Sequence, residues 1–145
     1  MRTTAIRHIG LVVRKLDPVL IFYRDLLGFT ILSRQRESGP VLERVLGRPQ
    51  VEVETVKLTA RDGEAVLELL DFRSPTIKNG GSSGLFKAGW SHLAVTVKDL
   101  SALYERLKSA GVPCNAPPQV SADGKVLMTF CQDPEGNWVE LVQPL

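Results

Sequence analysis

The chain has 145 residues, of which 43% are hydrophobic and 23% charged, and these are ordinary values for one globular domain with a core of its own. Its net charge of +2 is too small to indicate binding to nucleic acid or to a membrane surface. The N-terminus lacks an apolar run long enough for a signal peptide or a membrane span, so we expect no membrane partner and a cytoplasmic location. Two cysteines, Cys114 and Cys131, do not form a disulfide framework and fit a reducing compartment, although one bridge between them stays possible.

The first half of the chain, residues 5–72, has the pattern of a β-α-β-β-β module. Asp17-Pro18 predicts a helix start, because Asp is a good N-cap and Pro suits the first helical position. Gly28 predicts the end of that helix, and Arg61-Asp62-Gly63-Glu64 has the composition of a hairpin turn. Alternating apolar residues predict strands at 5–13, 29–37, 51–59 and 65–72, with one or two helical turns within the connection 38–50.

The second half repeats this order. Residues 73–89 lack periodicity and are rich in Gly and Ser, which is typical of a flexible connection or lid. In the module that follows, residues 90–143, Ser101 is expected to cap a helix that stops at Gly111, and Asp133 to Asn137 form a strong turn signal. Strands are expected at 90–97, 112–118, 125–132 and 138–142. The predicted fold class is therefore α+β.

The two modules share a sequence repeat. HIGLVVRKL, which begins at His8, and HLAVTVKDL, which begins at His92, both run from a histidine through apolar residues to a leucine. The two histidines lie 84 positions apart and are the only ones in the chain. Equivalent positions in a repeat are expected to have equivalent places in the fold.

Each module also carries one glutamate in an apolar strand. Glu68 lies in AVLELLD and Glu140 in WVELV, each shortly after the glycine of a turn. Burying an unpaired carboxylate is costly. Two modules related by an approximate two-fold axis would converge two imidazoles and two carboxylates on one point, a donor set that suits a divalent first-row metal. Taken singly, such a histidine is more often a core or edge residue and such a glutamate more often faces solvent. The joint pattern is what favours a metal site.

Three motifs, HIGLVVRKLDPVLIFYRDLLGF, SHLAVTVKDLSALYERLKSAGV and QDPEGNWVELVQP, resemble those of the vicinal oxygen chelate superfamily. This superfamily includes glyoxalase I, methylmalonyl-CoA epimerase, extradiol dioxygenases and bleomycin-resistance proteins. The resemblance covers nearly all of the chain. It implies a single domain over residues 1–145, in which two βαβββ modules form an eight-stranded incomplete barrel around a metal. The metal positions of the superfamily map to His8, Glu68, His92 and Glu140.

The resemblance also ranks the possible activities. Ring-cleaving dioxygenases use two His and one carboxylate, and the drug-binding proteins lack the ligand set, whereas all four positions are filled here. The resemblance therefore implies a lyase or isomerase of the glyoxalase I or epimerase type, with one divalent ion (Ni, Co, Mn, Zn or Fe) and a small substrate that has two neighbouring oxygens. Glu140 is the first choice for the base that removes a proton from carbon, and Glu68 the second. A dioxygenase and a non-catalytic drug- or metabolite-binding protein are the alternatives.

Residues outside the repeat would determine the substrate, and the motifs do not identify them. Four arginines near the second strand are candidates for binding a phosphate, a thioester-linked carrier or a carboxylate tail, although solvated arginines are the commoner case: Arg34, Arg36, Arg44 and Arg48. Glu43 is a further, less favoured candidate for the base. Half-barrel modules leave strand edges open, and the superfamily often covers them by dimerising, so we expect a homodimer.

Overall fold

The computed structural model describes residues 5–61, 65–78 and 84–145. The chain divides into two compact units, Met1–Gly80 (unit 1) and Gly81–Leu145 (unit 2), and each is described below by itself. Among the described residues, no helix has the length and apolar character needed to cross a membrane.

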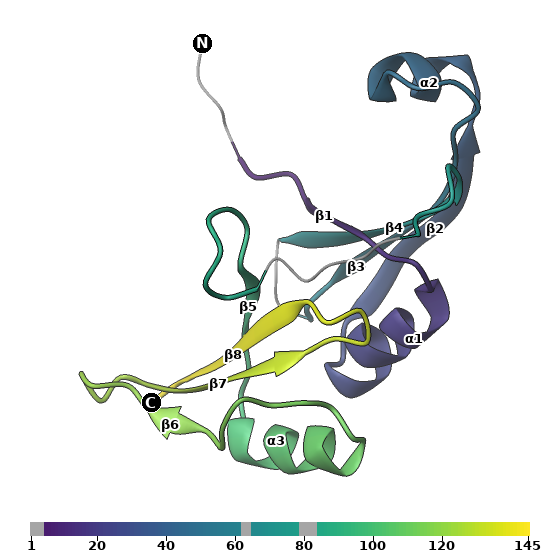
Figure 1. Ribbon diagram of the computed structural model, residues 1–145. Helices are drawn as coiled ribbons and strands as arrows, with labels where there is room; N and C mark the ends of the chain where they lie inside the picture. The colour runs from purple at the N-terminus through teal and green to yellow at the C-terminus, as the bar shows by residue number, and fades with distance from the viewer. Residues whose placement is uncertain (1–4, 62–64, 79–83) are drawn as a thin grey trace. The chain divides into compact units, whose positions relative to one another are not determined.

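Unit 1 consists of one four-stranded mixed sheet and two helical segments (Figure 1). The sheet has the order β1-β4-β3-β2, with β1 parallel to β4 and the other pairs antiparallel. Its elements are β1 (Ile9–Val12), α1 (Leu16–Leu20), the π-helical continuation η1 (Ile21–Leu26), β2 (Thr30–Ser38), α2 (Pro40–Leu46), β3 (Glu52–Thr59) and β4 (Val66–Ser74).

The helical segment formed by α1 and η1 buries one apolar face and ends just before Gly28, as its sequence predicts. Leu16, Val19, Leu20, Phe22 and Tyr23 are buried. The chain then turns at Gly28, whose φ of 78° lies in the left-handed region that glycine tolerates best. The predicted N-cap is wrong: the cap position is Lys15, and Asp17 lies within the first turn, where its charge favours the helix dipole.

Unit 2 repeats the same topology. Its sheet has the order β5-β8-β7-β6, with β5 parallel to β8. Its elements are β5 (His92–Thr96), α3 (Leu100–Ser109), β6 (Gln119–Val120), β7 (Val126–Gln132) and β8 (Trp138–Pro144). The core includes Leu100 and Leu107 of α3 and Val139 and Leu141 of β8, all of which are fully buried.

Two predictions for unit 2 are corrected. The N-cap of α3 is Asp99, whose Oδ1 accepts a hydrogen bond from the backbone N–H of Ala102 at 3.0 Å, and Ser101 lies inside the helix. The predicted strand 112–118 is wrong, because the strand that pairs with β7 is β6. Prolines at 113, 117 and 118 cannot donate to a ladder, and only Cys114 forms an isolated bridge there, to Cys131.

The predicted α+β class with two βαβββ modules is confirmed. The helix α2 is an insertion within the connection where helical turns were expected. The other strands agree with the prediction except for shifts at their ends; β1, for example, starts at Ile9 rather than at residue 5. The predicted turn 61–64 falls mostly outside the described residues.

Candidate metal centre

In unit 1 the predicted histidine and glutamate lie against one another. His8 immediately precedes β1, and its Nε2 is 3.2 Å from Oε2 of Glu68 in β4. The parallel pairing of β1 with β4 places Gly10 opposite Glu68. The Glu68 side chain is 13% exposed and that of His8 is 38% exposed, so the carboxylate is largely enclosed while the imidazole borders solvent.

Unit 2 contains the equivalent pair. His92 Nε2 lies 3.4 Å from Glu140 Oε2, and the parallel pairing of β5 with β8 places Ala94 opposite Glu140. The side-chain hydroxyl of Ser91 contacts the other ring nitrogen, Nδ1 of His92, at 2.8 Å. Such a contact fixes the orientation of the ring and leaves Nε2 directed at the carboxylate.

The two pairs have the same register. In each unit, the residue two positions after the histidine is the parallel partner of the glutamate. The same backbone arrangement thus brings the two side chains together twice, from sequence positions that the repeat had marked as equivalent.

The spacing of each pair fits two donors of one metal ion. Two donors about 2.1 Å from an ion are about 3.0 Å apart at an octahedral angle and about 3.4 Å apart at a tetrahedral one. The observed separations of 3.2 Å and 3.4 Å lie within this range. A neutral imidazole and a carboxylate are also a donor combination that first-row divalent metals accept.

Each pair by itself supplies two donors. Within the described ranges, no group of three or more His, Cys, Asp or Glu side chains lies close enough together to hold an ion. A site with the full set of four ligands would have to combine the pair of unit 1 with the pair of unit 2. That combination stays a prediction.

Two neighbours distinguish the pairs, and the sequence reasoning missed both. In unit 1, Lys57 of β3 is the antiparallel partner of Glu68, and its Nζ lies 3.4 Å from Glu68 Oε1. In unit 2, the equivalent partner of Glu140 is Phe130 of β7. The Phe130 ring packs edge-on against the His92 ring, with centroids 5.3 Å apart and an interplanar angle of 83°. A two-residue hairpin turn at Asp62-Gly63, which the sequence offers, would by itself place position 57 opposite position 68.

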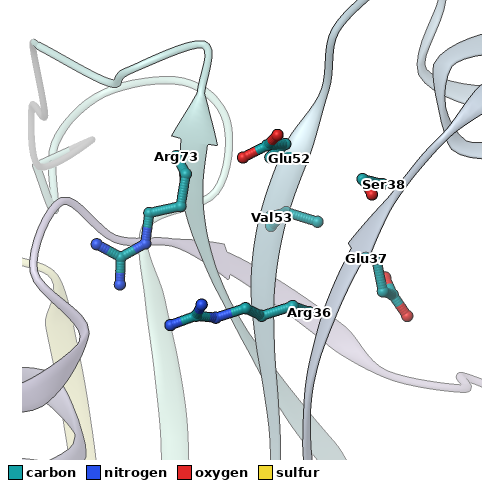
Figure 2. Close-up of a pocket in the computed structure, with 6 residues that line it drawn as sticks. All are labelled: Arg36, Glu37, Ser38, Glu52, Val53 and Arg73. Atoms are coloured by element: carbon teal, nitrogen blue, oxygen red, sulfur yellow. The ribbon is translucent and has the colours of Figure 1, made fainter.

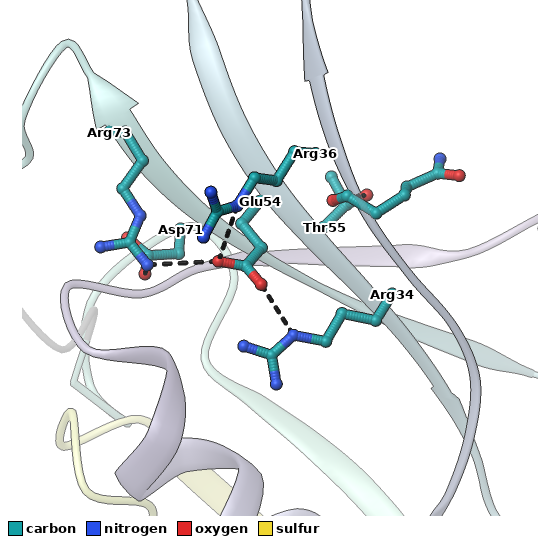
Figure 3. Close-up of polar contacts among 7 residues, drawn as sticks. Arg34, Arg36, Glu54, Thr55, Asp71 and Arg73 are labelled. Carbon is teal, nitrogen blue, oxygen red and sulfur yellow. Dashed lines mark hydrogen bonds and ion pairs between the residues drawn. The ribbon is translucent and has the colours of Figure 1, made fainter.

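A second charged cluster in unit 1 is centred on Glu54 (Figure 3). This carboxylate, which is 5% exposed, accepts hydrogen bonds from Arg34 Nε at 2.7 Å and Arg73 Nη2 at 3.2 Å, with Arg36 Nε at 3.8 Å. Arg73 also pairs with the buried Asp71 at 3.2 Å. The hydrogen bond from Arg34 is the main cause that holds the pKa of Glu54 below its ordinary value, against the opposing effect of burial.

This cluster lies on the opposite face of the unit 1 sheet from Glu68. Glu54 and Asp71 are cross-strand partners, as are Lys57 and Glu68, and the two pairs are an odd number of residues apart along continuous strands. Side chains alternate between faces along a strand. Arg34 and Arg36 therefore do not lie on the face that carries Glu68, which argues against their receiving the tail of a substrate bound there.

A surface pocket of about 490 Å³ adjoins the same cluster (Figure 2). Its lining consists of Arg36, Glu37, Ser38, Glu52, Val53 and Arg73. In Figure 2 the side chains of Arg36 and Arg73 extend toward the same side of the sheet, whereas Glu37 points away from them. The pocket is at the start of β3, while Lys57 is near its end, so it is separate from the His8–Glu68 pair.

Other predicted candidates have local roles or none that the contacts reveal. Glu43 accepts a hydrogen bond from the backbone N–H of Gln50 at 2.9 Å and so fixes the chain after α2. Arg44 and Arg48 are on or just after α2, outside the cluster of Glu54. A further residue beside the pair of unit 2 is Trp138, the parallel partner of His92.

Comparisons with known proteins agree with the fold and with its two modules. The model of the Glyoxalase/Bleomycin resistance protein/Dioxygenase superfamily matches residues 5–141. The chain is 28% identical over 139 residues to the uncharacterized protein YaeR of Escherichia coli strain K12, with 95% of each chain covered. It is 25% identical over 138 residues to a lactoylglutathione lyase of Haemophilus influenzae, with coverage of 95% and 91%. A crystal structure of a glyoxalase family protein from Bacillus cereus has a TM-score of 0.89 at 22% identity, over 100% of this chain and 97% of that one, and shows the same fold.

Proposed function

Because the chain belongs to the Glyoxalase/Bleomycin resistance protein/Dioxygenase superfamily, we propose that it is an enzyme, a lyase or isomerase that uses one divalent metal ion. The substrate is a small molecule with two neighbouring oxygens. The single observation that carries the proposal is the repeated His–Glu pair, at 3.2 Å and 3.4 Å, in the same register of both units. Relatives named lactoylglutathione lyase make the adduct of a 2-oxoaldehyde with a thiol the first substrate class to test.

In this proposal the four ligands are His8, Glu68, His92 and Glu140. Two carboxylates balance the charge of a divalent cation, and two neutral imidazoles complete the set. An ion held there would supply Lewis acidity toward a substrate carbonyl. Nickel, cobalt, manganese, zinc and iron are all compatible with these donors.

The chain's own residues then carry the proton transfer. Glu140 takes a proton from the hydroxyl-bearing carbon next to the carbonyl and delivers it to the carbonyl carbon, while the hydroxyl proton passes to the former carbonyl oxygen, so that the substrate is isomerised without an external oxidant or reductant. His92, with its ring oriented by Ser91, limits where the Glu140 carboxylate can rest. Phe130 packs edge-on against the ring of His92 and so restricts the movement of that ring. Glu68 is the second candidate for the base.

Elemental analysis of the purified protein is the first test, with about one divalent ion per chain expected. Chelation should abolish turnover of a methylglyoxal–thiol adduct, and added nickel, cobalt or manganese should restore it. Acyl-carrier thioesters are the second substrate class to assay. A protein that binds no metal and loses no function with His92→Ala would instead be a binding module.

The variant Glu140→Gln distinguishes the role of Glu140 as a general base from its role as a metal ligand. General-base catalysis contributes about 10²–10⁴-fold to rate, so turnover should fall by at least about 100-fold while the metal content changes far less. Glu105→Gln, at an exposed carboxylate of α3 in the same unit, is the matched control and should change neither quantity. Wild-type turnover by Glu140→Gln would contradict the assignment.

Oxygen dependence tests the dioxygenase alternative. A lyase or isomerase keeps its activity without oxygen, whereas cleavage of a catechol ring requires it.

We also propose that the protein is a homodimer, since β1 and β2 are the edges of one sheet and β5 and β6 of the other. Light scattering during gel filtration would give the mass in solution. A cytoplasmic location is proposed because both cysteines are free thiols.

A further inference from the structure

We propose that Lys57 is a positioning residue that holds Glu68 as a fixed, single-oxygen metal ligand, and that this leaves Glu140 as the carboxylate free to move. The inference rests on the proposed metal site and deepens it, because it assigns different tasks to two glutamates that the repeat presents as equivalent. The reason lies in the two side chains that oppose them across the antiparallel ladders.

In unit 1 the two oxygens of Glu68 have different partners. Oε2 faces Nε2 of His8 at 3.2 Å, while Oε1 faces Nζ of Lys57 at 3.4 Å. Lys57 and Glu68 are direct cross-strand partners, so the backbone sets their proximity. The Lys57 side chain is 32% exposed, so most of its surface is covered in the fold.

In unit 2 the position of Lys57 is occupied by Phe130. A phenyl ring carries no hydrogen-bond donor for the carboxylate, so β7 gives Glu140 no cation there. The ring packs instead against His92, the ligand partner of Glu140. The two half-sites therefore share their backbone register and their ligand types, and they differ in the group beside the carboxylate.

This difference has a consequence for coordination. An ammonium group that engages Oε1 leaves Oε2 as the oxygen directed at an ion, and it disfavours coordination through both oxygens. Movement of Glu68 away from the ion would also break its contact with Lys57. Glu140 has no such contact to lose on β7, so it can leave its position to take a proton and then return.

Three variants test the inference. Lys57→Met removes the ammonium group but keeps the length of the side chain, and Lys57→Arg keeps a cationic donor. The third variant is Lys125→Met. Lys125 is an exposed lysine that pairs with Asp123 in unit 2, and its variant is the matched control. Each metal-free protein is titrated with Co²⁺ by calorimetry, and the visible absorption spectrum of the cobalt protein is recorded, because that spectrum responds to coordination number and geometry.

Removal of a residue that orients a ligand typically weakens metal binding by about 10- to 100-fold. We expect Lys57→Met to weaken Co²⁺ binding by about 10-fold and to change the cobalt spectrum, whereas Lys57→Arg and Lys125→Met keep the wild-type affinity and spectrum. Circular dichroism of the metal-free proteins checks that all variants fold. A role in folding alone would not change the spectrum of the bound cobalt.

The outcomes separate the two proposals. If the wild type binds Co²⁺ and Lys57→Met matches it in affinity and spectrum, the role of Lys57 is refuted and the proposed metal site stands. If Lys57→Arg fails to restore the wild-type spectrum, a role that depends on the cationic donor is refuted as well. If the wild type binds no Co²⁺, the metal site itself is refuted, and the inference with it.

Discussion

Replacement of Glu54 by glutamine tests how much the arginine cluster of unit 1 stabilises the fold. The substitution preserves the shape of the side chain and removes its charge. Three guanidinium groups then lose a buried negative charge, although the amide oxygen can still accept a hydrogen bond and each arginine side chain is at least 47% exposed and can be hydrated. The loss of stability therefore depends on the contacts that Glu54 makes with the arginines, which Figure 3 shows.

The magnitude follows from the individual contacts. A hydrogen bond to a charged group contributes about 1.5–3 kcal/mol, and the exposure of Arg34 reduces the bond at 2.7 Å to about 1–2 kcal/mol. The longer bond from Arg73 adds about 0.5 kcal/mol, since Arg73 keeps its contact with Asp71. The expected loss is about 2 kcal/mol at pH 7, or about 4–8 °C in the melting temperature.

The pH dependence of stability is a separate test of the contribution of Glu54. The pKa of Glu54 is lowered in the folded protein, first of all by the hydrogen bond from Arg34. Its contribution to stability is therefore complete above the ordinary pKa of glutamate, about 4.3, and is lost as the pH falls through the folded value. Urea unfolding of wild type and Glu54→Gln should show a difference that shrinks in acid.

The control is Glu52→Gln, at an exposed carboxylate two residues earlier on the same strand, which should change stability by less than about 0.5 kcal/mol. Equal stability of Glu54→Gln and the wild type at pH 7 would contradict the stabilising role of the cluster. A difference between the two proteins that persists unchanged below the pKa of the carboxylate would contradict it as well.

Two further predictions concern unit 2. Asp133 is 3% exposed and accepts hydrogen bonds from the backbone N–H groups of Glu135 and Asn137. Asp133→Ala should therefore lower the free energy of unfolding, measured in urea, by about 2–3 kcal/mol, and Asp133→Asn should lower it by less. Burial, followed by the nearby Cys114 and Asp133, raises the pKa of Cys131 to about 12, so this thiol should resist alkylation in the folded protein at pH 8 and react once the chain is unfolded. Between about pH 8.5 and 12 this thiol ionises only in the unfolded chain, so the free energy of unfolding should fall as the pH rises through that range. Cys131→Ala should remove this part of the pH dependence. Rapid alkylation of native Cys131 would contradict the raised pKa.

The repeat is the part of the molecule that sequence reasoning predicted best. Two histidines at equivalent positions and two carboxylates in apolar strands led to two His–Glu pairs, and the structure brings the members of each pair to within 3.4 Å. The members of each pair could be matched from the sequence because strand alternation and module topology are both encoded in the hydrophobic pattern, while their role as metal ligands stays a prediction.

The residues that were missed or misplaced depend on geometry that such patterns do not carry. Asp99 and Ser101 are both good caps, and only the backbone conformation of Asp99 decides between them. The hydrophobic pattern gives Lys57 no special place. Only the strand register places it opposite Glu68. Arg34 and Arg36 were candidate substrate contacts by charge, and side-chain alternation along β2 and β3 then placed them on the other face of the sheet from Glu68.

The parallel pairing of the first and last strands of each module has a consequence for how the protein folds. His8 and Glu68 are 60 positions apart, and His92 and Glu140 are 48 apart, so each ligand pair closes a long loop. Contacts of large sequence separation form late, after the local hairpins and helices. During synthesis on the ribosome, neither pair can assemble before the last strand of its module has emerged. A metal ion held by all four proposed ligands would therefore meet two nearly completed modules, and its binding would stabilise the finished fold more than it would accelerate folding.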